Sequence, residues 1–500
     1  MYKISFFYLL FIFINYRLLA QIAPHDGSLL NYRIIGFSFP AAKGAVAYKL
    51  EIANGNCISD SSFRKNIIKS IKSKTNKLIT EVPSFSKEYT WRYIPSGNSD
   101  QKLKSALHHF TTGSIPEIDT AVNRFRVVKS AGKYKDAYVF LDVNKTLYDM
   151  KGNPVWYLPQ NDAGVQHSLR DLKITPQGTI TYEIDGCCAF EVNYDGKTLW
   201  KAPNNGKVSG ESTEEFHHEF TRLSNGHYMA LGQDFQYWKK PTATDTNLFY
   251  VSGSALAPEE KEKSYIRSPM GLLIEYDTIG NVVWSWKASD HFNGSDIFYS
   301  RTNGGMQMHA HENSFVFDEN KKVIYLSLRN QNRIVKIKYP EGIILDIYGG
   351  DNNKPGLPRK GNNFFCGQHS VNVSRKGYLY LFNNNSCNKG APPSVILMQE
   401  PVTEKDSLKK IWEYTINVAG KYQTGFASGG NVTELPDNSW FISTGSPESK
   451  VMIVTKDKKL LWSAIAEKRE PSTKTWGSII LYRASIILNR KELERLIWNQ

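Results

Sequence analysis

The sequence predicts an all-β protein, a six-bladed β-propeller preceded by a small N-terminal β-sandwich domain. Aromatic residues make up 13% of the chain, and Gly, Asn and Asp recur between short apolar runs. This composition is typical of strands joined by tight turns. A unit of two hairpins also recurs along most of the 500 residues, which indicates a repeat architecture.

The start of the chain has the features of a secretory signal. Lys3 is basic, residues 4–16 are apolar, and the small residue Ala20 precedes Gln21 at an expected cleavage site. We therefore expect residues 1–20 to be a signal peptide and the mature chain to be exported, to the periplasm or out of the cell. A membrane anchor is the alternative, but the stretch is shorter than the roughly 20 residues that a spanning helix needs. After signal removal we expect no stable membrane insertion.

Residues 21–118 alternate between apolar and polar side chains, as half-buried strands do. The apolar positions are Tyr48, Leu50, Ile52, Tyr89, Trp91 and Tyr93. This pattern predicts the small β-sandwich. We expect it to pack or dock, because none of its residue spacings indicates chemistry.

Residues 119–485 contain a repeated unit that ends in a strand, a turn and a second strand closed by Trp. Clear copies run from Tyr148 to Trp156, from Tyr194 to Trp200 and from Tyr276 to Trp284, and three looser copies follow. A hairpin precedes each copy, so one unit has about four strands, the size of a propeller blade. Six units predict a six-bladed catalytic domain, with residues 486–500 as a C-terminal tail. A β-sandwich array or a seven-bladed ring is the alternative.

Histidine recurs at one position of these hairpins. His218 and His369 each lie eight residues before the turn glycine, and His311 fits the position within one residue of register. The innermost strands of all propeller blades face one channel, so we expect the three imidazoles to converge there. Clustered histidines suit proton transfer, nucleophilic attack or metal binding. The corresponding positions of two other blades hold Arg170 and Gly430.

Arg329 lies on the strand that follows the hairpin opened by His311. Its planar guanidinium can bind two oxygens of a sulfate or phosphate, and a structural salt bridge is the alternative role. His217, His309 and His167 lie near the predicted channel positions and are candidates to support them.

The net charge of +14 attracts anions but does not choose among them. The chain has no compact arginine-rich run and no nucleic-acid fold signature, so no nucleic-acid partner is expected. Homo-oligomerisation remains open.

Five cysteines are too few for a disulfide-dense scaffold, but export permits individual bridges. Cys366 and Cys387 flank a predicted hairpin almost symmetrically, so a disulfide between them is compatible with the strand pairing. Cys187 and Cys188 are adjacent, and adjacent thiols seldom bridge because the intervening peptide must distort. We expect those two to be core residues or partners of another group.

Four segments, in this order, resemble the bacterial arylsulfotransferase family. They are Phe216-His217-His218-Glu219 with Leu223-Ser224-Asn225-Gly226, His311-Glu312-Asn313-Ser314 with Arg329 downstream, Gly367-Gln368-His369, and Gly430-Asn431 with Leu435-Pro436-Asp437. The resemblance includes Tyr348-Gly349-Gly350 and covers roughly residues 120 to 485. Two departures are visible: Leu328 stands where a second Ser commonly precedes the Arg, and Glu219 replaces the usual Asp.

The resemblance implies an exported six-bladed propeller that moves a sulfuryl group from an aryl sulfate ester to a phenol, without a nucleotide sulfate donor or any other cofactor. It identifies His369 with the nucleophile that forms a sulfohistidine. It identifies His218, His311 and Arg329 with the residues around the transferring group. We expect the substrate to be contacted by four further residues, Asn313, Gln368, His217 and His309.

Two other functions remain compatible with the sequence. Three imidazoles around one point can hold zinc or iron, although Arg329 beside a metal would be electrostatically unfavourable. A non-catalytic propeller that binds an anion or a partner is the second alternative.

Overall fold

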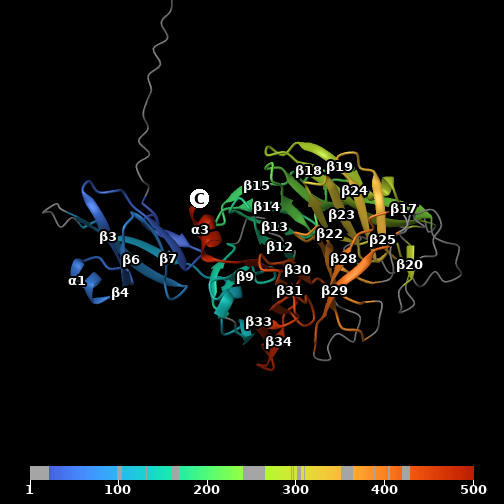
Figure 1. The fold of residues 1–500 in the computed structure, drawn as a ribbon. Coiled ribbons are helices and arrows are strands. Elements are labelled where there is room, and N and C mark those ends of the chain that lie inside the picture. The colour runs from blue at the N-terminus through green and yellow to red at the C-terminus, as the bar shows by residue number, and fades with distance from the viewer. Residues whose placement is uncertain are drawn as a thin grey trace, which may run out of the picture. The chain divides into compact units, whose positions relative to one another are not determined.

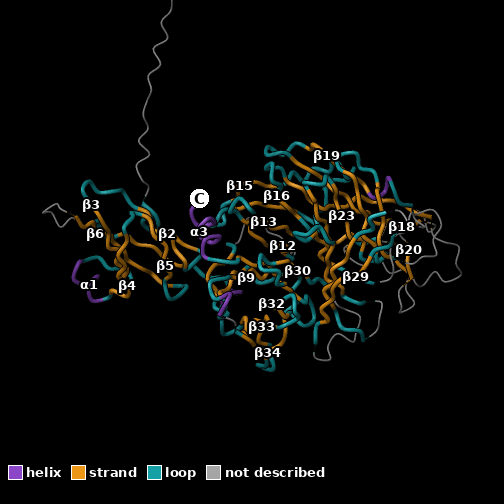
Figure 2. The backbone as a smooth tube through the Cα atoms, in the orientation of Figure 1, coloured by secondary structure: helices purple, strands orange, loops and turns teal. Residues whose placement is uncertain are grey.

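The computed structural model describes residues 22–97, 104–130, 132–159, 168–239, 265–293, 296, 298–300, 306–308, 310–350, 364–386, 390–403, 406–418 and 428–499. The chain divides into two compact units, residues 1–113 and residues 114–500 (Figure 1). We expected this boundary at residue 118. Strands predominate in both units (Figure 2).

The smaller unit has two strand layers, as expected of a small β-sandwich, and its strand pairs are antiparallel apart from the parallel pair of the first and seventh strands. Phe37 of the first layer packs edge-on against Trp91 of the second, with ring centres 5.1 Å apart. Glu51 and Arg92 are buried on the other face of the second layer, where they pair at 2.8 Å. The layers are β2 (Ile34–Ser38) with β5 (Lys77–Glu81), and β1 (Ser28–Leu30), β7 (His108–Thr112), β6 (Lys87–Gly97), β3 (Ala45–Asn54) and β4 (Ile67–Ser73), with helix α1 at Asp60–Lys65.

The larger unit contains, within its described residues, six sheets of four or more strands. We number them along the chain. Sheet 1 is β9 (Tyr138–Leu141), β10 (Thr146–Asp149), β11 (Pro154–Tyr157) and β35 (Ala484–Ile487); sheet 2 is β12 (Leu169–Ile174), β13 (Ile180–Ile184), β14 (Cys188–Val192) and β15 (Thr198–Lys201); sheet 3 is β16 (Phe220–Arg222), β17 (Tyr228–Lys239), β18 (Tyr265–Tyr276) and β19 (Val282–Lys287).

The remaining sheets follow the same antiparallel order. Sheet 4 is β22 (Glu312–Asp318), β23 (Val323–Leu328), β24 (Arg333–Lys338) and β25 (Ile344–Gly349); sheet 5 is β26 (His369–Val373), β27 (Leu379–Asn383), β28 (Ser394–Gln399) and β29 (Lys409–Thr415); sheet 6 is β30 (Asn431–Glu434), β31 (Trp440–Ser443), β32 (Lys450–Val454) and β33 (Leu460–Arg469), to which β34 (Trp476–Ser478) and β8 (Asn123–Lys129) add. A separate ribbon pairs β20 (Phe298–Ser300) with β21 (Met306–Met308), and short 3₁₀ turns lie at Pro116–Ile118, Gly132–Tyr134 and Ala288–Asp290.

The repeated Trp explains how neighbouring sheets are joined. In four sheets its indole N–H donates to a backbone carbonyl in the repeated turn of the next sheet. These bonds run from Trp156 to Tyr194 (2.7 Å), from Trp284 to Pro340 (2.7 Å), from Trp412 to Lys456 (2.9 Å) and from Trp462 to Met150 (3.1 Å). The last bond joins sheet 6 to sheet 1, so the sheets form a closed ring. The all-β propeller prediction is confirmed.

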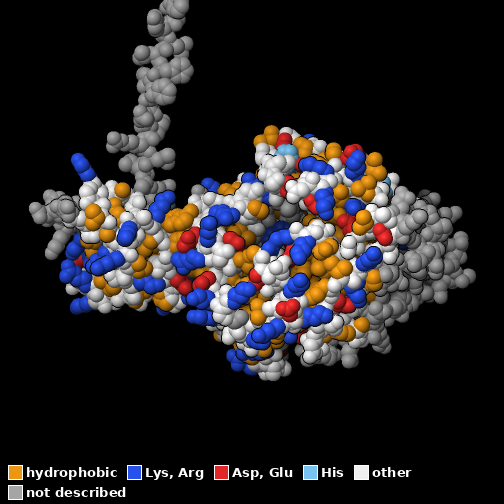
Figure 3. All heavy atoms as spheres, in the orientation of Figure 1, with side chains coloured by type: hydrophobic (Ala, Val, Ile, Leu, Met, Phe, Trp, Pro, Cys, Tyr) orange, Lys and Arg blue, Asp and Glu red, His pale blue; other side chains and the backbone are white. Residues whose placement is uncertain are grey.

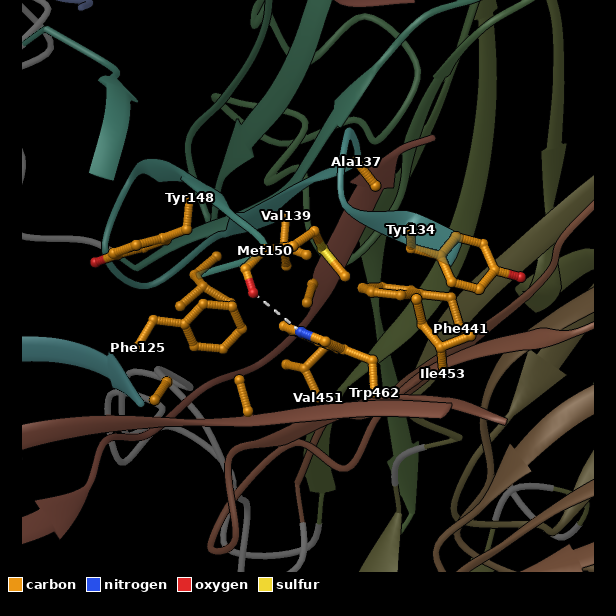
Figure 4. Close-up of a cluster of buried hydrophobic side chains, with 14 of the residues drawn as sticks. Phe125, Tyr134, Ala137, Val139, Tyr148, Met150, Phe441, Val451, Ile453 and Trp462 are labelled. Atoms are coloured by element: carbon orange, nitrogen blue, oxygen red, sulfur yellow. Dashed lines mark hydrogen bonds between the residues drawn. The ribbon is translucent and has the colours of Figure 1, made fainter. Parts of the chain in front are cut away.

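Strands from both ends of the larger unit complete the closure. β35 pairs antiparallel with β9, with Ala484 opposite Leu141. β8 likewise pairs with β33 of sheet 6. Aromatic side chains of the two sheets form one buried cluster that includes Phe125, Tyr148 and Trp462 (Figure 4). The pairing uses residues that are far apart in sequence, so the ring depends on contacts that only the folded chain makes.

The predicted C-terminal tail, residues 486–500, is described up to residue 499. This part contains the end of β35 and helix α3 (Arg490–Trp498), which Asn489 caps by accepting from the backbone of Glu492 at 3.1 Å. Leu493, Leu496 and Ile497 are buried. Their i, i+3, i+4 spacing gives the helix one apolar face, which burial stabilises.

The adjacent cysteines differ from expectation. Cys187 and Cys188 form a disulfide. Cys187 lies in the turn between β13 and β14, after Gly186 in the left-handed conformation (φ 73°), and Cys188 begins β14. Cys366 is disulfide-bonded, and its predicted partner Cys387 lies outside the described residues. Cys57 is the free cysteine of the described part of the chain.

The surface charges are mixed. On the face shown in Figure 3, Lys and Arg side chains are interspersed with Asp and Glu. In the part of the chain that the structure describes, no helix is long and apolar enough to cross a membrane. The predicted signal peptide, residues 1–20, lies outside that part.

Candidate active site

The predicted histidines come together where the inner strands of sheets 3, 4 and 5 begin. The rings of His218 and His311 are 5.2 Å apart, centre to centre. The ring of Tyr482 lies 5.6 Å from that of His218 and 6.0 Å from that of His369. Tyr482 therefore connects the histidines of sheets 3 and 5.

Irregular backbone at these strand starts directs the side chains. The pairing of inner and second strands shifts register after Arg170, Glu312 and His369. His218 and His311 have φ values of 66° and 55°. Bulges of this kind bend a strand and redirect a side chain, which is how a regular sheet can present a polar cluster at its end.

His369 is 1% exposed and is held through one ring nitrogen. Its Nδ1 lies 2.7 Å from Oδ1 of Asn384 and 3.2 Å from the carbonyl oxygen of Gly367. Burial, together with the charge of Arg329, lowers the pKa of His369 well below its usual value. The imidazole is therefore neutral near pH 7, as a nucleophile must be.

His217 and His218 form a neutral pair. Their Nδ1 atoms lie 2.8 Å apart, and Nε2 of His217 lies 3.0 Å from the carbonyl oxygen of Gly232. That carbonyl can only accept, so His217 carries its proton on Nε2 and His218 donates from Nδ1. Burial lowers the pKa of His217 to about 4 and that of His218 well below its usual value. Nε2 of His218 is left as an unprotonated base.

Arg329 follows β23, next to the strand start that carries His311. Its backbone N–H donates to the carbonyl oxygen of His311 at 3.0 Å, and its Nη1 lies 3.2 Å from Oδ1 of Asn330. Its effect on the pKa of His369 indicates that the guanidinium charge reaches that ring. A half-buried cation beside the histidines favours an anionic substrate group.

The other predicted site residues contact protein. Both ring nitrogens of His217 are used as described above. Asn313 and Gln368 are fully buried, and Nδ2 of Asn313 donates to the carbonyl oxygen of Gln368 at 2.7 Å. The Gln368 amide donates to Ser327 and to the carbonyls of Leu328 and Arg333, each at 3.1 Å. These bonds join sheets 4 and 5 behind the histidines. His309 and His167 lie outside the described residues.

Sequence reasoning missed Arg483, which immediately precedes β35. It takes the position in sheet 1 that His311 takes in sheet 4, because each accepts a backbone bond from the residue that follows the second strand of its sheet. Its guanidinium donates to Asp171 (2.9 Å), Glu219 (2.6 Å) and the carbonyl oxygen of Asn313 (2.9 Å), so it joins four sheets. Lys173 donates to the same two carboxylates at 2.6 and 2.8 Å. One feature of the sequence could have pointed to Arg483. It directly precedes an apolar run at residues 484–487 that has no hairpin partner nearby in sequence.

Tyr482 and Arg170 were also missed as site residues. The Arg170 guanidinium lies 4.1 Å from the centre of the Tyr482 ring and donates to Asp185 at 2.8 Å. Burial raises the pKa of Tyr482 to about 12, so the phenol stays protonated. No group of three or more His, Cys, Asp or Glu within the described residues is arranged to hold a metal. The cluster thus combines neutral imidazoles with fixed cations.

Comparison with family models gives one match, over part of the chain. Residues 244–450 match the family model described as Arylsulfotransferase (ASST). No curated protein matches the chain.

Similar solved structures share little sequence. A protein of unknown function from Bacteroides caccae is 11% identical, with a TM-score of 0.38, over 73% of this chain and 99% of that one. An auxiliary nutrient binding protein from Bacteroides ovatus is 10% identical, with a TM-score of 0.35, over 92% and 89%. Apo AztD from Citrobacter koseri is 10% identical, with a TM-score of 0.31, over 88% and 98%. Their functions do not carry over to this chain. What the comparisons show is a match of residues 244–450 to the arylsulfotransferase family model.

Proposed function

We propose that the protein moves a sulfuryl group from an aryl sulfate ester to a phenol through a sulfohistidine on His369, without a nucleotide donor. The family match supports aryl sulfotransferase activity in general. The observation that carries the specific proposal is a buried, neutral His369 that is bonded through Nδ1 and lies within reach of the Arg329 charge. Its Nε2 is then the atom that attacks sulfur.

In the donor step, the Nε2 lone pair of His369 forms a bond to sulfur, and the bond between sulfur and the aryl oxygen breaks. The electron pair leaves with that oxygen as phenolate. Arg329 stabilises negative charge on the sulfuryl oxygens, since a fixed cation in a water-poor site costs little reorganisation. In the first turnover the phenolate leaves as the anion, because Nε2 of His218 carries no proton at rest. In later turnovers it takes the proton that His218 holds after the acceptor step.

In the acceptor step, Nε2 of His218 removes the proton of the acceptor phenol. The phenol oxygen attacks sulfur, the nitrogen–sulfur bond breaks, and its electron pair returns to Nε2 of His369. His218 then holds one proton, which the next departing phenolate removes. The depressed pKa of His218 suits this return, because its imidazolium is a good acid. Asn313, Gln368 and His217 support the cluster through their bonds to protein.

We propose further that the protein acts outside the cytoplasm, after removal of residues 1–20. The Cys187–Cys188 disulfide and the bridged state of Cys366 support this location, because disulfides persist in oxidising compartments. Neither step requires a diffusible cofactor.

The test is turnover of a chromogenic aryl sulfate by the mature protein, with and without a second phenol. We expect the acceptor phenol to stimulate phenolate release. The His369→Ala variant should lose this release, and a chelator should leave it intact. A quenched reaction with labelled donor should leave label on His369. Release without label on His369 would contradict the sulfohistidine. Binding of aryl sulfate without release would favour a non-catalytic propeller, and inhibition by the chelator would favour a metalloenzyme.

A further inference from the structure

Asn384 lies directly after β27 and is 1% exposed. Its side chain makes two bonds. Oδ1 lies 2.7 Å from Nδ1 of His369, and Nδ2 donates to the carbonyl oxygen of Gly429 at 3.0 Å. The amide thus bridges sheet 5 to the segment that leads into sheet 6.

The two partners fix the orientation of this amide. The Gly429 carbonyl has no hydrogen to donate, so it can face only the NH₂ end of Asn384. The oxygen end must then face His369. A reversed amide would place two oxygens against each other at Gly429 and lose both bonds, which is costly for buried groups.

The fixed amide in turn selects the tautomer of His369. Nδ1 faces two acceptors, Oδ1 of Asn384 and the carbonyl oxygen of Gly367 at 3.2 Å. A lone pair on Nδ1 would face both oxygens, so Nδ1 carries the proton. In the neutral ring the lone pair then resides on Nε2.

We propose that Asn384 is a positioning residue for His369: it holds the Nδ1 proton, so that Nε2 presents its lone pair to the sulfur of the substrate. This inference rests on the proposed function. When the Nε2 lone pair becomes the nitrogen–sulfur bond and the bond from sulfur to the aryl oxygen breaks, the ring, which keeps its Nδ1 proton, becomes cationic. Oδ1 of Asn384 then accepts from a charged donor, and such a bond is about twice as strong as a neutral one. Asn384 therefore stabilises the intermediate more than the resting ring.

Other charged and titratable groups also face His369. Arg329 and Arg483 both lower the pKa of its imidazole, and the phenol ring of Tyr482 lies 6.0 Å away, centre to centre. Each of these comes from another element, and a substitution of Asn384 leaves all three residues in the chain. A change in the titration of His369 in that variant can therefore be assigned to residue 384.

The test uses two variants of Asn384 and a matched control in the next residue. Asn384→Leu removes the acceptor, and Asn384→Asp keeps an acceptor and adds a negative charge beside Nδ1. Asn385→Asp adds the same charge to a partly exposed side chain whose amide bonds the carbonyl of Pro392, not His369. The measurements are the rate of label transfer from aryl sulfate to His369, the pH dependence of kcat/KM for the donor step, the donor Kd and the melting temperature.

We expect Asn384→Leu to slow labelling about 10- to 100-fold, the range for loss of a group that orients a ligand, with the donor Kd unchanged. In Asn384→Asp, the carboxylate favours the imidazolium, so the acidic limb of the pH profile moves to higher pH while labelling persists at alkaline pH. Asn385→Asp should keep the wild-type profile. If Asn384→Leu does not fold, the comparison of the two Asp variants decides.

Labelling at the wild-type rate in Asn384→Leu would overturn the inference, as would equal shifts in the two Asp variants. These results differ from failure of the proposed function, which would appear as no label on His369 in the wild type. A purely structural Asn384 would lower the melting temperature without moving the pH profile.

Discussion

Nδ1 of His217 lies 2.8 Å from Nδ1 of His218, so the two neighbouring histidines are hydrogen-bonded to each other through their Nδ1 atoms. Such a bond needs one proton for two nitrogens. Gly232 settles which ring supplies it: its carbonyl oxygen accepts a hydrogen bond from Nε2–H of His217, so Nδ1 of His217 is unprotonated and His218 is the donor. The contact orients His218 as a base in the same way that Asn384 orients His369.

The first prediction concerns this contact. His217→Leu removes the acceptor for Nδ1 of His218, and we expect acceptor-stimulated turnover to fall about 10- to 100-fold. His217→Asn can place its Oδ1 near the position of Nδ1, and should retain more activity than the Leu variant. Steady-state kinetics with a saturating donor and varied phenol measure the effect. Equal losses in both variants would show that ring packing, and not the hydrogen bond, is what His217 supplies.

The second prediction concerns Arg483. Arg483→Met leaves Asp171 and Glu219 buried with Lys173 as their remaining cation, and removing one member of a buried pair costs about 3 to 5 kcal/mol. The melting temperature should fall by several degrees. Lys338→Met is the control, because it breaks an ion pair with Glu341 in which both side chains are exposed. A similar fall in both variants would contradict the role assigned to Arg483.

The sequence indicates that three histidines lie close together because they recur at one position of the repeat. His369 begins the inner strand of its sheet, and His218 and His311 lie just before the inner strands of theirs. The repeated turn and Trp indicate where each of these strands lies in the ring. In four sheets this Trp also donates a hydrogen bond to the next sheet. The residue that marks the repeat in the sequence is therefore one that joins the sheets in the structure.

Arg483 and Tyr482 could not be predicted in this way. They lie at the start of β35, which pairs with a strand more than three hundred residues earlier, from Ala484 to Leu141. No local spacing identifies that register. Asn384 lies between two other asparagines, and sequence alone does not indicate which of the three faces His369.

The third prediction is a pH dependence of stability. Burial raises the pKa of Glu312 to about 7, above the value near 4.5 of an unfolded glutamate. The folded state therefore binds this proton more tightly than the unfolded state does. The contribution of the bound proton to the free energy of unfolding is fully present below pH 4.5 and is lost as the pH rises through 7. The difference corresponds to ~3 kcal/mol. Glu312→Gln does not titrate, so relative to wild type it should be more stable at pH 8 than at pH 4.

Denaturant unfolding at the two pH values measures this difference. One carboxyl oxygen of Glu312 has no hydrogen-bond partner among the described residues, so the amide can replace the protonated acid there. The difference in free energy of unfolding between Glu312→Gln and wild type should change with pH. If it is the same at both pH values, Glu312 is charged in the folded state at pH 8 without loss of stability.

The fourth prediction tests the position of Tyr482. Gly429 has φ +70°, and a Cβ there would lie 2.4 Å from the carbonyl oxygen and 2.8 Å from Cδ2 of Tyr482. Gly429→Ala must therefore displace Tyr482, whose ring contacts those of His218 and His369. A displacement of about 1 Å near reacting groups can cost about 100-fold in rate. Turnover and melting temperature are measured together.

Gly210→Ala is the matched control. Gly210 has φ +83°, so alanine is strained there as well, but a Cβ at this position meets no atom within 4 Å. Both variants share the left-handed backbone cost of roughly 1 to 2 kcal/mol. We expect the melting temperature of both variants to fall. Only Gly429→Ala should also have a lower rate of sulfuryl transfer. If Gly210→Ala loses as much activity, backbone strain alone explains the effect, and the placement of Tyr482 between the histidines does not limit the reaction.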